Sequence, residues 1–360
     1  MKYLGIIAGI LALAANSLMG HFPYLADVIY YRTIFQLVRA VYDHTLGLLP
    51  VPMVYVLFCI LVWIIAHLLG KVWDSMKSGH SITTKVVAVA TAILNPIGWV
   101  LFAFYFLWGW NYQRTPFEQR MGLPTVTADT TYLYQEALQL AQQLAAQRRQ
   151  LKADSMSFTY SDVPSDMESI FRQHQEQLIS GWGEPTLGRV RIRVLQPQGI
   201  LLRISTAGVY IPFVCEGHID KGLHPLQYPF TMAHEMAHGY GYTDEGVCNF
   251  VGYLTCLSTD SPMLQYSGKL GYFRYVLSNL RTYAPASYKE VRSGLSYGIR
   301  LDLHDIATQM DKFPDIMPEV RNAVYDSYLK SHGVSQGIAN YNDIVRLVAQ
   351  YRATEESSQD

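Results

Sequence analysis

The chain has 360 residues, of which half are hydrophobic and only 16% are charged. Its formal net charge of -1 gives no indication of a polyanionic partner, so we expect no nucleic-acid partner. Apolar residues concentrate near the start of the chain. The composition therefore predicts a membrane domain over residues 1–110, a folded domain over 111–354, and a disordered polar tail over 355–360.

Three apolar segments predict transmembrane helices, at about residues 4–20, 51–69 and 86–110. The second is the clearest, because a 19-residue helix covers about 28 Å, close to the thickness of the hydrocarbon core. The first is short and contains Ala12-Leu13-Ala14, so a cleaved signal peptide is the alternative to the retained helix that we favour. In the third, we expect the Asn95 side chain to bond the backbone that Pro96 frees.

The segment from His21 to Pro50 mixes aromatic, apolar and charged residues. Its apolar residues are expected either to lie along the membrane interface or to pack on the domain that follows. Lysines near the amino terminus and between the second and third spans exceed the arginines of this segment. By the positive-inside tendency, we expect a multi-pass protein of the cell membrane, in contact with the lipid bilayer, whose folded domain is extracytoplasmic.

After residue 110 the apolar pattern predicts an α+β domain that is mostly helical and has a small mixed sheet. Helical periodicity predicts helices at Thr130–Gln150, Asp166–Ile179, Phe250–Leu257, Met263–Thr282, Pro318–Leu329 and Tyr341–Tyr351. Alternating residues predict strands at Val190–Val194, Gly199–Ser205 and Gly208–Val214. Pro212 places the last of these at the edge of the sheet, where Val209–Phe213 is a candidate to pair with an extended peptide.

The segment His234-Glu235-Met236-Ala237-His238 is an H-E-x-x-H pattern. On a helix, residues four apart share a face, so both imidazoles can bind one metal ion with Glu235 beside it. The uncharged residues around them suit a buried helix. Two histidines at this spacing predict a site for one Zn²⁺ ion, with His234 and His238 as ligands.

A catalytic zinc site needs a third protein ligand, and Glu245 is the one that we favour. A helix that continued unbroken would place Glu245 about 10 Å beyond His238, so the helix must end between them. Gly239 and Gly241 allow this break. A second helix that begins near residue 244 then brings Glu245 back towards the histidines.

Asp244 is the rival third ligand, in the spacing H-E-x-x-H-x-x-G-x-x-D, although an N-cap of the second helix is its simpler interpretation. Asn249 lies four residues after Glu245, where its side chain can hydrogen-bond and orient a ligand. This E-x-x-x-N pattern resembles the glutamate helix of the gluzincin branch of zinc peptidases. The resemblance implies a zincin-like fold for the domain.

Zinc acidifies a bound water molecule, and Glu235 can accept its proton as general base. This chemistry predicts a metalloendopeptidase that acts on a peptide or protein substrate. A donor for the developing oxyanion is also needed, and Tyr266, His218 and His304 are candidates among which the sequence does not choose. The alternative is a non-hydrolytic membrane sensor or binding module with a structural or ligand-binding zinc.

The segments IPFVCEGH, YPFTMAHEMAHGYG, DEGVCNF and QYSGKLGYF resemble an uncharacterised family of bacterial membrane proteins with N-terminal spans and a zinc-peptidase-type domain. The resemblance covers most of the chain and implies an acidic residue at the positions of Glu245 and Val247, and an asparagine at that of Asn249. Val247 departs from this pattern, so the resemblance supports Glu245 as the ligand.

Overall fold

The computed structural model describes residues 3–316, 318, 319, 323, 327 and 343–357. The protein is mostly helical with a small mixed sheet, as the sequence predicts. It divides into two compact units. The first unit comprises Met1–Thr115, Leu187–Arg189 and Ile211–Glu216, and the second comprises Pro116–Thr186, Val190–Tyr210 and Gly217–Asp360.

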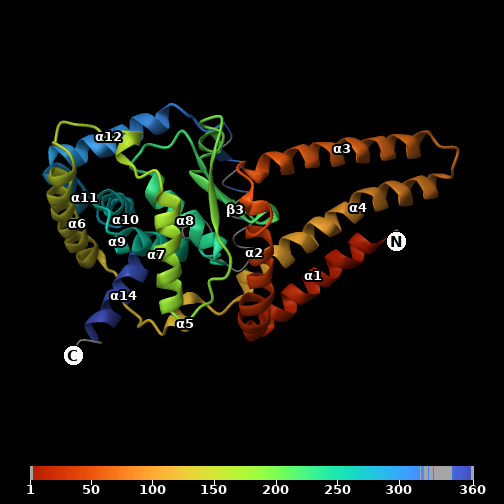
Figure 1. The fold of residues 1–360 in the computed structure, drawn as a ribbon, viewed down its shortest axis with the longest axis horizontal. Coiled ribbons are helices and arrows are strands. Elements are labelled where there is room, and N and C mark those ends of the chain that lie inside the picture. The colour runs from red at the N-terminus through yellow and green to blue at the C-terminus, as the bar shows by residue number, and fades with distance from the viewer. Residues whose placement is uncertain (1–2, 317, 320–322, 324–326, 328–342, 358–360) are drawn as a thin grey trace. The chain divides into compact units, whose positions relative to one another are not determined.

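The first unit contains three helices that are long and apolar enough to cross a membrane (Figure 1). They are α1 (Leu4–His21), α3 (Met53–Lys77) and α4 (Ile82–Leu107), and each covers one of the predicted spans. Most of their large apolar side chains are exposed, which suits a hydrocarbon environment and not water.

Helix α1 packs closely on α4 through glycines. A Cβ atom added at Gly98 would lie 2.1 Å from the carbonyl oxygen of Gly5, and one at Gly9 would lie 2.8 Å from the Cα atom of Gly98. The Asn95 side chain accepts a hydrogen bond from the Gly5 N–H at 2.8 Å. The first turn of α1 thus offers a backbone donor without a helical partner to the Asn95 side-chain oxygen. The bond to the carbonyl that Pro96 frees would use the Asn95 amide nitrogen and stays a prediction.

The register of this packing makes α1 and α4 parallel. Gly5 lies against Asn95, near the middle of α4, whereas the indole of Trp110, just beyond its end, donates to the Ala12 carbonyl at 3.3 Å. The ends of α1 and α4 therefore lie on the same side of this unit. The connection from α1 to α3 forms a π-helix, η1 (Leu25–Phe35), then α2 (Gln36–Asp43) and a short 3₁₀ turn, η2 (Leu46–Leu48).

The second unit contains most of the remaining helices, which enclose one hydrophobic core. They are α5 (Phe117–Met121), α6 (Thr130–Leu151), α7 (Met167–Gly181), α8 (Tyr228–Gly239), α9 (Glu245–Ser258), α10 (Pro262–Tyr283), α11 (Pro285–Gly294), α12 (Tyr297–Asp311) and α14 (Ile344–Ser357). Helices α6, α7, α10 and α14 cover the corresponding predicted helices to within a few residues, except that α14 ends six residues later. Helix α9 begins at Glu245, close to the start predicted near residue 244, and continues through the predicted Phe250–Leu257. The predicted helix Pro318–Leu329 falls mostly outside the described residues.

The polar tail predicted to be disordered is partly helical. Glu355–Ser357 form the last turn of α14, where the Glu355 side chain hydrogen-bonds Tyr351 one turn earlier. This contact between residues four apart stabilises the end of the helix. Residues 358–360 lie outside the described residues.

The sheet has the order β1-β3-β2, with β1 at Arg191–Leu195, β2 at Gly208–Ile211 and β3 at Glu216–Asp220. The predicted strand Gly199–Ser205 is wrong, because this segment folds into a turn and the 3₁₀ helix η5 (Leu202–Ile204). The Asp220 carboxylate accepts the backbone N–H groups of Gly199 and Leu201, both at 2.7 Å. The Asp220 side chain thus bonds backbone N–H groups that, in a strand, would donate to a neighbouring strand. Pro212 ends β2 early, at the 3₁₀ turn η6 (Pro212–Val214).

Candidate metal centre

The turn between α8 and α9 brings the predicted ligands together. Helix α8 ends at Gly239, and Gly241 follows with a φ of 88°, a conformation that favours glycine and reverses the chain. Helix α9 then begins at Glu245. Asp244 is its N-cap, and its carboxylate accepts the Val247 N–H at 2.9 Å. The turn therefore delivers Glu245 to the face of α8 that carries His234 and His238.

The side chains of His234, His238 and Glu245 converge on one point inside the second unit. The two Nε2 atoms are 3.2 Å apart. The Oε2 atom of Glu245 lies 3.1 Å from Nε2 of His234 and 3.4 Å from Nε2 of His238. All three residues are buried, with exposed fractions of 5% to 7%.

Hydrogen bonds fix which atom of each imidazole faces the centre. The Nδ1 atom of His238 lies 2.9 Å from the Tyr242 carbonyl oxygen, which can only accept, so Nδ1 carries the proton. The Nδ1 atom of His234 lies 2.8 Å from the Asn249 side-chain oxygen and donates in the same way. In these neutral tautomers, both Nε2 atoms direct lone pairs towards each other and towards a carboxylate oxygen. The lone pairs of these three atoms repel one another unless a proton or a metal cation lies between them.

The directions in which the pKa values of Glu245 and His238 shift also indicate that the cluster favours a positive charge. Burial would raise the pKa of Glu245, but the two histidines outweigh it and lower this pKa below its usual range. Burial would lower the pKa of His238, but Cys248 and Glu245 outweigh it and raise this pKa. The cluster therefore favours an added cation or proton.

Zinc fits this donor set. Nitrogen and carboxylate ligands bind zinc at about 2.0–2.2 Å in a tetrahedron, so neighbouring ligand atoms lie about 3.3 Å apart. The three separations of 3.1 to 3.4 Å match one face of that tetrahedron. Three protein ligands are typical of catalytic zinc sites, whereas structural sites use four.

Glu235 lies on α8 between the two histidines and faces the sheet. A Cβ atom added at Gly208, the first residue of β2, would lie 2.6 Å from Oε1 of Glu235. One added at Gly217 of β3 would lie 3.1 Å from the Glu235 Cβ. Two glycines of the sheet therefore make room for this side chain. Burial raises the pKa of Glu235 to about 7, although His234 and His238 lower it in part.

The family described as "Protein of unknown function (DUF3810)" matches residues 30–349. The chain belongs to this family. The match includes the whole of α8 and α9 and therefore the convergent histidines and glutamate. No curated protein and no solved structure matches the chain. The predicted resemblance to an uncharacterised family is confirmed, and the description of the DUF3810 family assigns no reaction to it.

The three candidate oxyanion donors lie in different surroundings. The Tyr266 hydroxyl donates to the buried carboxylate of Asp302, which also pairs with Arg148, so it serves the core of the second unit. His218 is fully buried in β3, at the centre of the sheet. His304 is exposed on α12.

The structure adds two residues that the sequence analysis missed. The Tyr275 hydroxyl on α10 donates to the Asn249 side-chain oxygen at 3.3 Å, so Asn249 accepts from both Tyr275 and His234. The second residue is Gly208, which borders the Glu235 carboxylate. In the sequence, Tyr275 is part of an ordinary helical pattern, and Gly208 is a residue type typical of turns. Neither position carries a motif that connects it to the histidines.

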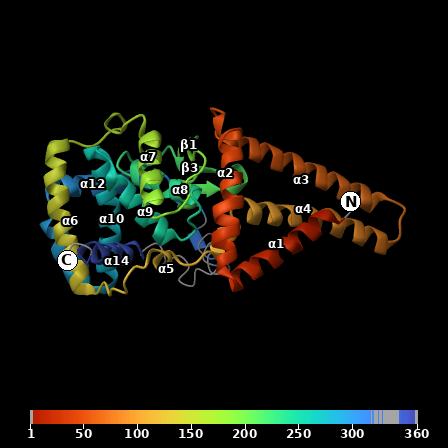
Figure 2. The ribbon, with the colours of Figure 1, turned by 60° about the horizontal axis from the view of Figure 1, so that its bottom comes forward.

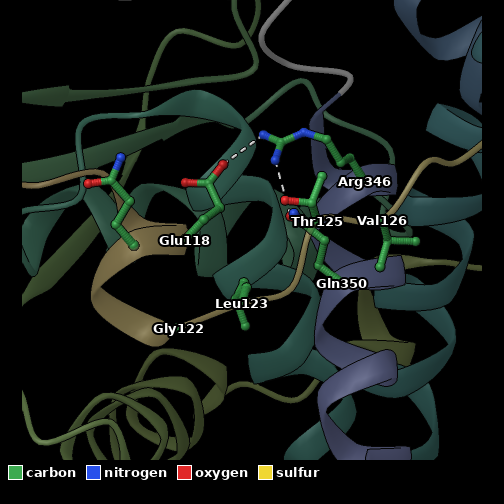
Figure 3. Close-up of a pocket in the computed structure, with 8 residues that line it drawn as sticks. Glu118, Gly122, Leu123, Thr125, Val126, Arg346 and Gln350 are labelled. Carbon is green, nitrogen blue, oxygen red and sulfur yellow. Dashed lines mark hydrogen bonds and ion pairs between the residues drawn. The ribbon is translucent and has the colours of Figure 1, made fainter.

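A separate cavity of about 440 Å³ lies away from these ligands, beside α5 and α14 (Figure 3). Its one arginine, Arg346, donates to Glu118 at 2.7 Å and to Asp343 at 3.1 Å. The guanidinium is thus already engaged by two carboxylates, and His234, His238 and Glu245 do not line the cavity. We therefore assign the candidate chemistry to the metal centre and not to this cavity.

We expect Asn249→Ala to lower zinc affinity by about 10-fold to 100-fold, the usual effect of removing a hydrogen-bond partner of a ligating histidine. Tyr275→Phe should cause a smaller loss, because it removes only the second donor to Asn249. Competition with a chromogenic chelator measures both affinities. Tyr283→Phe, at an exposed position on the same helix, is the matched control. An unchanged affinity in Asn249→Ala would contradict the role given to this residue.

Proposed function

We propose that this protein is a membrane-anchored, zinc-dependent metalloendopeptidase with a zincin-like catalytic domain. One zinc ion would be held by His234, His238 and Glu245. The observation that carries the proposal is the convergence of two imidazole nitrogens and a carboxylate oxygen at tetrahedral spacing, with a buried carboxylate next to them in the sequence.

Zinc in this site would supply a Lewis acid and lower the pKa of a coordinated water to about 7. Glu235 then acts as the general base, because it is the remaining carboxylate next to the ligands. It accepts the proton of the attacking water and passes it to the amine that leaves as the peptide bond breaks. Because Asn249 and the Tyr242 carbonyl hold the two imidazoles in one tautomer, the ligands need no rearrangement during the reaction.

The position of Glu235 relative to the sheet supports a peptide substrate. Strand β2 is an outer strand in the order β1-β3-β2, and its first residue, Gly208, borders the Glu235 carboxylate. An extended peptide that pairs with an outer strand gains backbone hydrogen bonds without a requirement for particular side chains. The pairing segment would be Gly208–Ile211. It ends two residues before the end of the Val209–Phe213 candidate, because η6 begins at Pro212.

The orientation in the membrane is also part of the proposal. Parallel α1 and α4 place the residues that follow both helices on one side, and the loop between α3 and α4 on the other. Lys77 and Lys85 flank that loop, which favours its location in the cytoplasm. We therefore place the catalytic domain outside the cytoplasm of a multi-pass membrane protein.

We expect Glu235→Gln to retain zinc and to lose peptide hydrolysis by about 10²-fold to 10⁴-fold, because only the proton acceptor is removed. Glu245→Ala should lose the metal, because a ligand is gone. Asp244→Ala, next to it, is the matched control and should retain the ion, since its carboxylate caps α9. Metal analysis of the purified full-length protein and mass spectrometry of a digested peptide library measure the two properties.

Two outcomes would contradict this assignment. If wild-type protein binds zinc but cleaves no peptide beyond the Glu235→Gln background, a non-hydrolytic sensor or binding module replaces the peptidase. If Glu245→Ala keeps its zinc and Asp244→Ala loses it, the assignment of the third ligand is wrong.

We expect Gly208→Ala to reduce hydrolysis on the order of 10²-fold while zinc content stays unchanged, because the added methyl group displaces the Glu235 carboxylate. Gly294→Ala is the matched control, since a Cβ atom there meets nothing within 4 Å. Initial rates on the best library peptide measure the effect. Full activity in Gly208→Ala would show that Glu235 works from a different position.

A reporter fused after Asp360 tests the orientation. We expect a phosphatase that is active only outside the cytoplasm to be active in this fusion, and green fluorescent protein, which fluoresces when folded in the cytoplasm, to stay dark when it is exported unfolded. The opposite pattern would place the domain in the cytoplasm, without affecting the metal chemistry.

A further inference from the structure

Helix α2 of the first unit buries its charged side chains and leaves two of its apolar side chains exposed, while the apolar Val38 is buried with the charged ones. Gln36, Arg39 and Asp43 are buried, whereas Leu37 and Val41 are 60% and 62% exposed. A helix on a water-soluble surface shows the reverse arrangement.

The buried polar face of α2 makes several hydrogen bonds within the first unit. The Arg39 guanidinium pairs with both oxygens of Asp43 at 2.8 and 2.7 Å and donates to the Cys215 carbonyl at 2.8 Å. The same Asp43 carboxylate accepts the Arg189 N–H at 2.6 Å, and the Gln36 side chain accepts the Leu187 N–H at 3.0 Å. These contacts determine which side of α2 faces inward. They leave the leucine and valine side facing out.

The apolar outer face continues beyond α2. Leu48 in η2 is 61% exposed, and the aromatic side chains of Phe22 and Tyr24, just after α1, are exposed as well. Aromatic residues of this kind are enriched where a protein passes through the membrane interface. Exposed apolar residues therefore occur along the chain from the end of one membrane-crossing helix, α1, to the start of the next, α3.

The orientation of α2 also supports a position at the membrane interface. In both views α2 runs across the direction of α1, α3 and α4, near the ends at which α1 finishes and α3 begins (Figures 1 and 2). A helix in this orientation lies in the plane of a membrane that the other three cross. An apolar face about 5–10 Å deep in the boundary between headgroups and acyl chains is the usual position of an interfacial helix.

We propose that Leu25–Leu49 is an interfacial segment whose outer face, formed by Leu37, Val41 and Leu48, contacts the acyl chains of the bilayer. Its inner face holds Leu187–Arg189, which leads towards β1, and Ile211–Glu216, which joins β2 to β3. These two segments are continuous along the chain with β1, β2 and β3. The sequence left two interpretations of this segment open, and the inverted polarity of α2 favours the interface.

Spin labels at Leu37→Cys and Val41→Cys test the proposal in the full-length protein. The background variant is Cys59→Ser, because the other three cysteines are buried. The protein is reconstituted in phosphatidylcholine and phosphatidylglycerol vesicles, and collisions of each label with oxygen and with a water-soluble nickel chelate are measured. Phe58→Cys, exposed on α3, is the lipid reference, and Ser278→Cys, exposed on α10, is the water reference.

We expect the oxygen-to-nickel collision ratio at residues 37 and 41 to exceed that at residue 278 several-fold and to fall at or below that at residue 58. A ratio equal to that at residue 278 would show that α2 faces water. Labels that neither reagent reaches would show that a protein surface, such as a second copy of the chain, covers the helix. Either result overturns the proposal, and neither bears on zinc binding or hydrolysis.

Discussion

The candidate centre depends on the electrostatics of three electron-rich atoms held together in the protein interior. Two imidazole nitrogens and one carboxylate oxygen lie 3.1 to 3.4 Å apart, and the hydrogen bonds on the far side of each ring prevent a simple rotation away. Without a positive charge at the centre this arrangement would be repulsive. A proton on one imidazole or a metal ion at the centre removes this repulsion, and the second possibility is the basis of the proposed zinc site.

Close packing between elements maintains the arrangement. A Cβ atom at Gly252 of α9 would lie 3.0 Å from the His234 backbone nitrogen, and one at Gly239 of α8 would lie 2.3 Å from a Val190 methyl carbon. The absence of side chains at these glycines lets α9 and the segment leading into β1 approach α8 closely. Close approach of α9 to the His234 backbone and of Val190 to the end of α8 therefore positions the ligands, and such packing favours a preorganised site.

Much of this centre could be predicted from the sequence, because its signals are local. The four-residue spacing of His234 and His238, the break at Gly241 and the start of a new helix at Glu245 all follow from helix geometry and glycine conformations. Asp244 could also be read as a cap from its position alone. The distance between His238 and Glu245 along an unbroken helix was enough to predict a turn between α8 and α9.

The features that could not be predicted depend on partners distant in sequence. Asp220 removes a strand by accepting backbone donors some 20 residues earlier, and Asn95 bonds Gly5, 90 positions away. Tyr275 and Gly208 have roles only because α10 and β2 happen to pass beside Asn249 and Glu235. Periodicity and spacing within one segment contain no information about such contacts.

Helix α2 shows a further limit of sequence patterns. Its alternation of polar and apolar side chains predicts an amphipathic helix in either medium, because periodicity identifies two faces without saying which one is buried. The ion pair of Arg39 with Asp43, together with the bonds to Cys215 and Arg189, decides the question. Once the charged face is satisfied inside the protein, exposure of the apolar face to water would be unfavourable. A bilayer removes that penalty. Burial of the apolar face of α2 in the bilayer would therefore stabilise the first unit as well as anchor it.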